Sequence, residues 1–166
     1  MIITKRTRTA EILPFLNKDT LEQLLLQIEP FPLKKTVIQM TLREYFACLD
    51  GTYVAELLKE RRAYKAFGML RQMRMEMEQI AKILKQNKIE ESAEQKQARF
   101  GVSFPSSEEC ILIDVCKFFN LKSLEDAGKV RVAEWLMIHR YQSATNKFEY
   151  NYNRIMTSKA KLKNDR

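Results

Sequence analysis

Apolar residues recur every three or four positions along most of this chain, which is the spacing of one face of an α-helix. Steps of three and four alternate over three heptads in one series: Ala63, Ala66, Leu70, Met73, Met77, Ile80 and Leu84. This seam predicts one long helix from Thr52 to about Asn87. A second stripe predicts a helix from about Val130 to Thr157: Met137, Tyr141, Ala144, Phe148, Tyr152 and Ile155.

Shorter helices are indicated by a polar residue that is followed three positions later by an acid, the pattern of a capping box. The pairs are Asp19–Glu22, Thr41–Glu44, Ser106–Glu109 and Ser123–Asp126. Gly51 and Gly128 stand where two of these helices should end. The helix at 108–119, EECILIDVCKFF, is apolar almost all round, so we expect it at the centre of the core.

The fold class that follows is mainly α, with two long helices and several short ones in a single domain of 166 residues. Only four Gly and four Pro argue against a hairpin-rich fold. The prediction leaves open one small strand pair, between residues 1–4 (MIIT) and 33–40 (LKKTVIQM). We expect 1–17 and 158–166 to be flexible ends.

Charge and cysteine content indicate the class of protein and its compartment. The formal net charge is +8, and residues 139–166 alone carry seven basic and two acidic residues. Three cysteines form no disulfide framework, which suits a reducing compartment. No apolar run approaches the roughly 18 residues of a membrane span. We therefore expect a soluble cytoplasmic protein without a membrane partner.

Few residues could carry chemistry. The three cysteines Cys48, Cys110 and Cys116 and the single histidine, His139, could in principle form a metal site. Cys110 and Cys116 are six positions apart, about 120° around a helix, and do not converge easily. The hypothesis of buried thiols is preferred to a metal site or a Cys-His nucleophile, so no metal, no cofactor and no enzymatic activity are expected.

Residues 117–136 look at first like a DNA-reading helix-turn-helix. The helix that would enter the major groove, SLEDAGKV, has two acids in its first turn, and these would repel phosphates. We interpret it as a structural turn. Nucleic-acid contact by a basic face of the last helix stays open as an alternative, and it would use Arg140, Lys147, Arg154, Lys159, Lys161 and Lys163.

Methionine-rich and aromatic helix faces instead favour a protein partner, because methionine repacks easily against varied shapes. The candidate partner-binding residues are Leu70, Met73, Met75, Met77, Tyr141, Phe148 and Tyr152. Met75 stands off the heptad seam, whereas Tyr141, Phe148 and Tyr152 share a face that we expect to pack inward. The sequence leaves open which of the two seams is internal, and self-association follows if the heptad seam is not covered within the chain.

Residues 112–142 resemble the C-terminal part of tail assembly chaperones of long-tailed bacteriophages. The resemblance rests on an apolar helix ending in an aromatic pair (115–119), a Ser-containing turn (121–123), an acidic one-turn helix (124–126) and an aliphatic-acidic-aromatic run (132–136). The helix at 40–51, MTLREYFACLDG, is similar to one near the start of small phage assembly proteins. The resemblance implies a non-enzymatic assembly or scaffold factor, located in the host cytoplasm or the virion, with a phage structural protein as partner.

Overall fold

The structure, a computed structural model, describes residues 3–4, 6–60, 62–86 and 106–164. These residues are mainly α-helical, as the sequence predicts. Their helices are α1 (Thr9–Ile12), η1 (Leu13–Phe15), α2 (Lys18–Gln27), η2 (Val37–Gln39), α3 (Leu42–Leu49), α4 (Thr52–Leu58), α5 (Ala63–Gln86), α7 (Ser107–Phe119), α8 (Leu124–Gly128) and α9 (Val132–Asn164), where η marks a 3₁₀ helix. The described residues of the two segments that could have paired, 3–4 and 33–40, form no strand.

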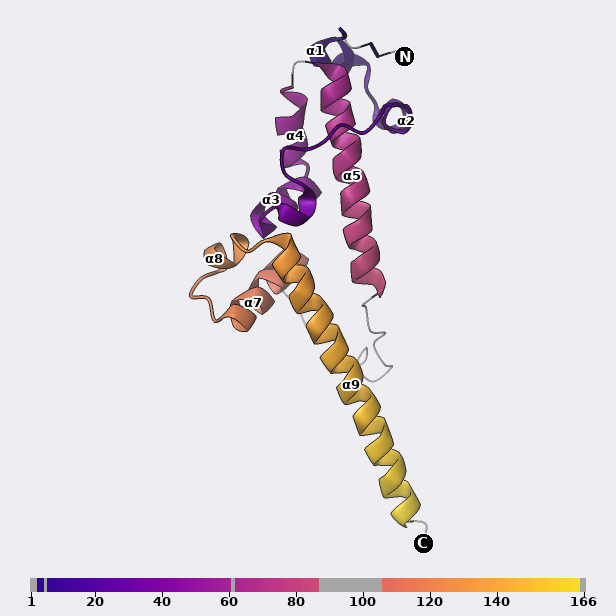
Figure 1. Ribbon diagram of the computed structural model, residues 1–166, viewed down its shortest axis with the longest axis vertical. Helices are drawn as coiled ribbons and strands as arrows, with labels where there is room; N and C mark the ends of the chain where they lie inside the picture. Colours follow the sequence, from indigo (N-terminus) through magenta and orange to yellow (C-terminus); the bar gives the residue numbers. More distant parts are fainter. Residues whose placement is uncertain (1–2, 5, 61, 87–105, 165–166) are drawn as a thin grey trace.

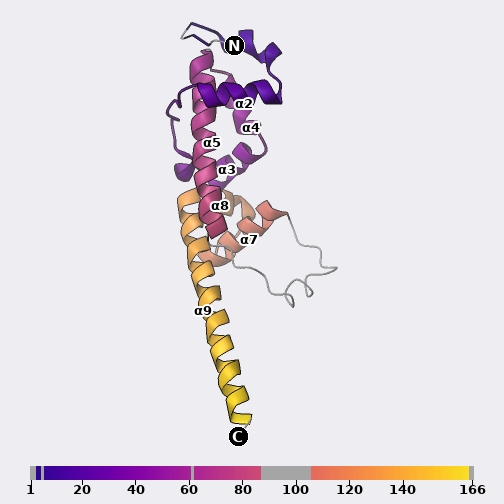
Figure 2. The ribbon, with the colours of Figure 1, turned by 90° about the vertical axis from the view of Figure 1, so that its right-hand side faces the viewer.

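The two long helices set the shape of the molecule. Helix α5 occupies one end with α1, α2, α3 and α4 around it, and α9 continues along the same long axis toward the other end (Figure 1). Helices α7 and α8 lie beside the start of α9, and the chain termini lie at opposite ends (Figures 1 and 2). The second half of α9 therefore extends away from the other described helices.

Local capping signals place several helix starts correctly. Thr41 Oγ1 accepts the Glu44 N–H at 3.3 Å, and Glu44 Oε2 accepts the Thr41 N–H at 2.6 Å. Burial raises the pKa of Glu44, but hydrogen bonds from Lys35 and Thr41 outweigh this and lower it overall. Ser106 with Glu109, and Ser123 with Asp126, cap α7 and α8. Helix α2 differs, because its cap is Asn17 rather than Asp19, and Asp19 lies inside the first turn.

The single helix expected from Thr52 to Asn87 is wrong, because the chain leaves the helix between α4 and α5. A distant segment holds this break. The Ala63 N–H donates to Thr7 O at 3.0 Å, and the Thr9 hydroxyl donates to Glu60 O at 2.5 Å. Arg8 and Arg62 form an antiparallel bridge. These long-range hydrogen bonds replace intrahelical ones, and no local pattern signals them.

A short backbone pairing joins the two parts of the fold. Residues 40–42 run antiparallel to 130–132: the Leu42 N–H donates to Val130 O and the Val132 N–H donates to Met40 O, each at 2.8 Å. Met40, Leu42 and Val132 are fully buried. Helix α3 begins at Leu42, the last residue of one segment, and α9 begins at Val132, the last residue of the other, so both helices start from the same junction.

Aromatic packing extends this junction into both helices. Tyr45 of α3 and Trp135 of α9 are buried with ring centroids 5.7 Å apart. Leu136 and Ile138 add to the buried face of α9. Helix α7 is less central than the sequence suggests, since Val115 is its one buried residue and Phe118 and Phe119 are exposed. Its all-round apolar character therefore leaves part of its surface uncovered.

The heptad seam of α5 is internal. Ala63, Ala66, Leu70, Met73 and Ile80 are buried, and Met77 and Leu84 are partly buried against the same core. Residues 29–31 cross α5 at Gly68, and the Phe31 N–H donates to Gly68 O at 3.0 Å. A Cβ at position 68 would lie 2.8 Å from both Glu29 O and Phe31 Cβ. The crossing segment thus requires glycine there.

Replacing Gly68 by alanine should lower the free energy of unfolding by about 1–3 kcal/mol in urea titrations, because the backbone at Glu29 has to move. Gly128→Ala is the control, since its Cβ would meet Arg43 Cβ at an ordinary 3.8 Å. Helix propensity alone favours alanine over glycine by about 1 kcal/mol, so the control should be neutral or stabilising. Equal effects of the two substitutions would contradict the close crossing.

Candidate protein-interaction surfaces

An apolar groove lies between α2, α3, α4 and α5. Its volume is about 450 Å³. Arg74 and Glu78 are its charged members, and the remaining lining is Leu21, Leu25, Tyr45, Leu49, Val54, Leu70, Met73, Met77 and Ala81. Such a surface suits an apolar side chain from a partner rather than a charged ligand.

The candidate residues of α5 lie at this groove with different exposure. Leu70 and Met73 line it but are 7% and 4% exposed, so they contribute mainly to the core. Met77 lines it and is partly buried. Met75 does not line this groove and is 42% exposed. The structure therefore brings three of the four α5 candidates together and leaves Met75 on a neighbouring surface.

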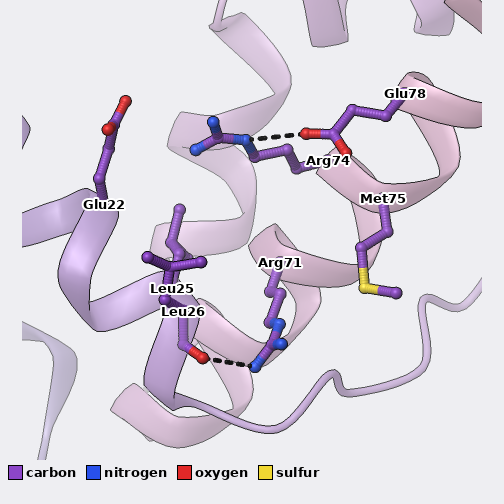
Figure 3. Close-up of a pocket in the computed structure, with 7 residues that line it drawn as sticks. All are labelled: Glu22, Leu25, Leu26, Arg71, Arg74, Met75 and Glu78. Carbon is purple, nitrogen blue, oxygen red and sulfur yellow. Dashed lines mark hydrogen bonds and ion pairs between the residues drawn. The ribbon is translucent and has the colours of Figure 1, made fainter.

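That neighbouring surface is a smaller hollow of about 270 Å³ between α2 and α5 (Figure 3). Glu22, Leu25 and Leu26 face it from α2, and Arg71, Arg74, Met75 and Glu78 face it from α5. Arg74 Nε and Glu78 Oε1 form an ion pair at 3.3 Å. Leu26 is 76% exposed at its edge. Because both hollows include Leu25, Arg74 and Glu78, they form adjoining parts of one face.

Arg71 fixes α2 on this face. Its guanidinium donates hydrogen bonds to Leu26 O, at 3.1 Å, and to Ile28 O. These carbonyls belong to the C-terminal end of α2 and its continuation, where an α-helix leaves carbonyl groups without intrahelical donors. A cation at this end also complements the helix dipole. These hydrogen bonds attach the C-terminal end of α2, which forms one side of the face, to α5.

Helix α9 presents a second surface of another kind. Every residue from Asn146 to Ala160 is exposed. The stripe residues Met137, Tyr141 and Phe148 are 63%, 63% and 68% exposed, and Tyr152 and Ile155 are also exposed. The expectation that Tyr141, Phe148 and Tyr152 pack inward is therefore wrong. The Phe148 and Tyr152 rings stack on each other, with centroids 6.2 Å apart.

The geometry of α9 explains this exposure. At 100° per residue, the buried residues Val132 and Trp135 lie on the face roughly opposite the stripe, whereas buried Ile138 borders the stripe. Because Trp135 packs against Tyr45 at the junction, the stripe of α9 faces solvent along its whole length. Near the body the stripe meets Phe118, whose ring lies 6.0 Å from Tyr141 and 5.4 Å from Phe119. These aromatic residues are exposed along one side of α7 and α9, and exposed apolar surface of this kind is typical of an interaction site.

Basic residues of α9 also face solvent. Arg140, Lys147, Arg154 and Lys159 are exposed, and none of them makes an ion pair with a residue that the structure describes. Lys161 and Lys163 belong to α9, but the structure describes only their backbone and not their side chains. The segment SLEDAGKV, which we interpret as a structural turn rather than a DNA reader, contains the short helix α8, whose Asp126 forms an ion pair with Lys129 at 2.9 Å.

The residues with candidate chemistry lie apart from these surfaces. No group of three His, Cys, Asp or Glu side chains in the described parts of the chain could hold a metal ion. Cys48 is buried, and burial together with the nearby Glu44 and Asp50 carboxylates raises its pKa to about 11. That thiol is protonated at neutral pH, which makes it a poor nucleophile. His139 Nδ1 is buried without a hydrogen bond from any described residue, and burial lowers the pKa of this imidazole.

Among the described residues, no helix combines the length and the apolar character needed to cross a membrane.

Comparison with known proteins gives no relative: no protein-family model, no curated protein and no solved structure matches this chain.

Two features of these surfaces were not predicted from the sequence. The first is the exposed pair Phe118 and Phe119, which the sequence placed in a central helix. The second is the α2 edge of the groove, where Leu24 and Leu25 are buried but Leu26 is exposed. Three consecutive leucines cannot share one helix face, because adjacent residues are 100° apart. The run of three leucines at 24–26 could therefore have predicted that one of them is exposed.

The double substitution Phe148→Ala and Tyr152→Ala should leave the free energy of unfolding within about 0.5 kcal/mol of the unmodified chain, because both side chains are exposed. Trp135→Ala on the opposite face should cost about 3–5 kcal/mol. Chemical denaturation followed by circular dichroism measures both. A large loss of stability in the double variant would show that the stripe is already covered within the chain.

Proposed function

We propose that this chain is a non-enzymatic protein-binding factor, of the kind that assembles or scaffolds other proteins. The observation that carries the proposal is the exposed stripe of α9, which has the spacing of a packed seam but no described partner. Amphipathic helices with such stripes bind partner proteins through the residues at three- and four-residue steps. The α2–α5 groove offers a second apolar contact on the same molecule.

The class of partner follows from the resemblance of residues 112–142 to tail assembly chaperones. These residues form most of α7, α8 and the first turns of α9, which hold the stripe in position. A phage structural protein with an apolar helical segment is accordingly the partner that we propose. Work of this kind takes place in the host cytoplasm or on the assembling particle.

A second candidate function is that of a small basic nucleic-acid-binding accessory subunit. The exposed cations of α9 favour it, since a row of lysine and arginine can follow a phosphate backbone. The aliphatic members of the stripe, Met137 and Ile155, weigh against it because a duplex backbone presents no apolar surface to cover them. The protein-binding function is therefore preferred.

A photoreactive phenylalanine analogue at position 148 should cross-link to a specific protein when the full chain is produced in its native cell. The same analogue at Asn153, about 140° around α9, is the matched control and should give little or no adduct. Mass spectrometry of the adduct identifies the partner. Adducts of equal yield at both positions would contradict a stripe-directed contact.

Labelled single- and double-stranded DNA, titrated over a salt series, separates the two candidate functions. The proposed function predicts no measurable binding near physiological salt. Tight binding that falls steeply with salt, with a log-log slope of several units, would support the nucleic-acid function instead.

A further inference from the structure

The exposed stripe of α9 is bordered along one edge by a row of basic residues. Arg140, Lys147 and Arg154 each directly precede a stripe residue, namely Tyr141, Phe148 and Ile155. Each cation is therefore about 100° around the helix from its neighbour in the stripe, and successive cations are about 10.5 Å apart along the axis. We call these three residues the basic edge.

Nothing described within the chain neutralises the basic edge. Its three side chains are exposed and form no ion pair with any residue in the described parts of the structure. Glu149 is the only acidic residue between positions 140 and 160, and it follows Lys147 by two positions. Two positions correspond to about 200°, so this carboxylate lies far from the basic edge.

A second copy of the chain fits this surface poorly. If the stripe is the seam of a coiled coil, the basic edge occupies the flanking positions that pair across the interface. Two antiparallel copies would place the two basic edges against each other. Two parallel copies would bring Arg154 near Lys159 of the other helix. In the heptad register that puts the basic edge beside Tyr141, Phe148 and Ile155, the alternate seam positions are Ala144, Asn151 and Ser158. Small or polar residues that face each other there give two copies little apolar surface to bury.

We infer that the stripe and its basic edge select an acidic amphipathic helix of another protein. This inference rests on the proposed protein-binding function and names the chemistry of its partner. A helix with a seven-residue apolar repeat presents its own flanking positions at the same interval of about 10.5 Å. Glutamate or aspartate at those positions would pair with Arg140, Lys147 and Arg154 while the apolar faces cover each other. The like charges on two copies would disfavour self-pairing at the same surface.

The test uses the full chain and two fluorescent synthetic helical peptides with the same leucine seam. One peptide carries glutamate at its flanking positions and the other carries lysine. Fluorescence anisotropy near an ionic strength of about 0.15 M, where exposed charges are screened beyond about 8 Å, should show at least about tenfold tighter binding of the glutamate peptide. That factor corresponds to about 1.4 kcal/mol.

A charge-reversed variant makes the test specific to the basic edge. Arg140→Glu, Lys147→Glu and Arg154→Glu together should reverse the preference, so that the lysine peptide binds more tightly. The matched control is Lys18→Glu, Lys34→Glu and Lys122→Glu, which changes the net charge equally at exposed positions away from α9. This control should keep the original preference. Circular dichroism verifies that both variants are folded.

The other outcomes separate the inference from the proposed function. Equal binding of both peptides that is lost in the Phe148→Ala, Tyr152→Ala variant would overturn the acidic-partner inference and leave the protein-binding function standing. Absence of binding to either peptide would also overturn the inference. Salt-sensitive DNA binding that disappears in the charge-reversed variant would overturn both in favour of nucleic acid. Concentration-dependent dimerisation through the stripe would identify a second copy as the occupant and would overturn the inference.

Discussion

The antiparallel pairing of residues 40–42 with 130–132 is the constraint on which the arrangement of this molecule depends. The segment that supplies residues 40–42 is also attached to α5, because the Val37 N–H donates to Glu76 Oε2 at 2.6 Å. The same few residues thus connect the α5 part of the fold to the start of α9. Burial of Met40, Leu42 and Val132 removes water from these hydrogen bonds, which makes their loss costly. The starting point and direction of α9 are fixed there.

The orientation of the exposed stripe follows from this junction. Once Trp135 packs against Tyr45, the opposite face of α9 turns outward. The helix continues beyond the other described helices (Figure 2), and residues 146–160 are exposed. Isolated helices draw little stability from propensity alone, and Asn146, Asn151 and Asn153 are poor helix formers. A partner that covers the stripe would bury aromatic surface and stabilise this half of α9 at the same time. Binding of a partner to the stripe would therefore also supply the stability that the second half of α9 lacks as an isolated helix.

The features predicted correctly from the sequence are those that neighbouring residues determine. Thr41 with Glu44 and Ser106 with Glu109 place helix starts because both partners of each cap lie within one turn. The break before Ala63 could not be found in this way, because its hydrogen bonds come from Thr7 and Thr9, more than 50 positions away. Periodicity identified both long seams but not which one is buried, since that depends on the tertiary packing of Trp135. For the candidate site, periodicity found Tyr141, Phe148 and Tyr152 but assigned them to the interior.

We claim that the apolar face of the second half of α9 is covered by no side chain of the residues that the structure describes. Hydrogen exchange of the full chain, followed by mass spectrometry at low protein concentration, tests it most directly. We expect amides of residues 146–160 to exchange with little protection, while those of Leu42 and Val132 approach the protection set by global unfolding. Protection of residues 146–160 equal to that of the junction would show that the stripe is already covered, and it would contradict the claim.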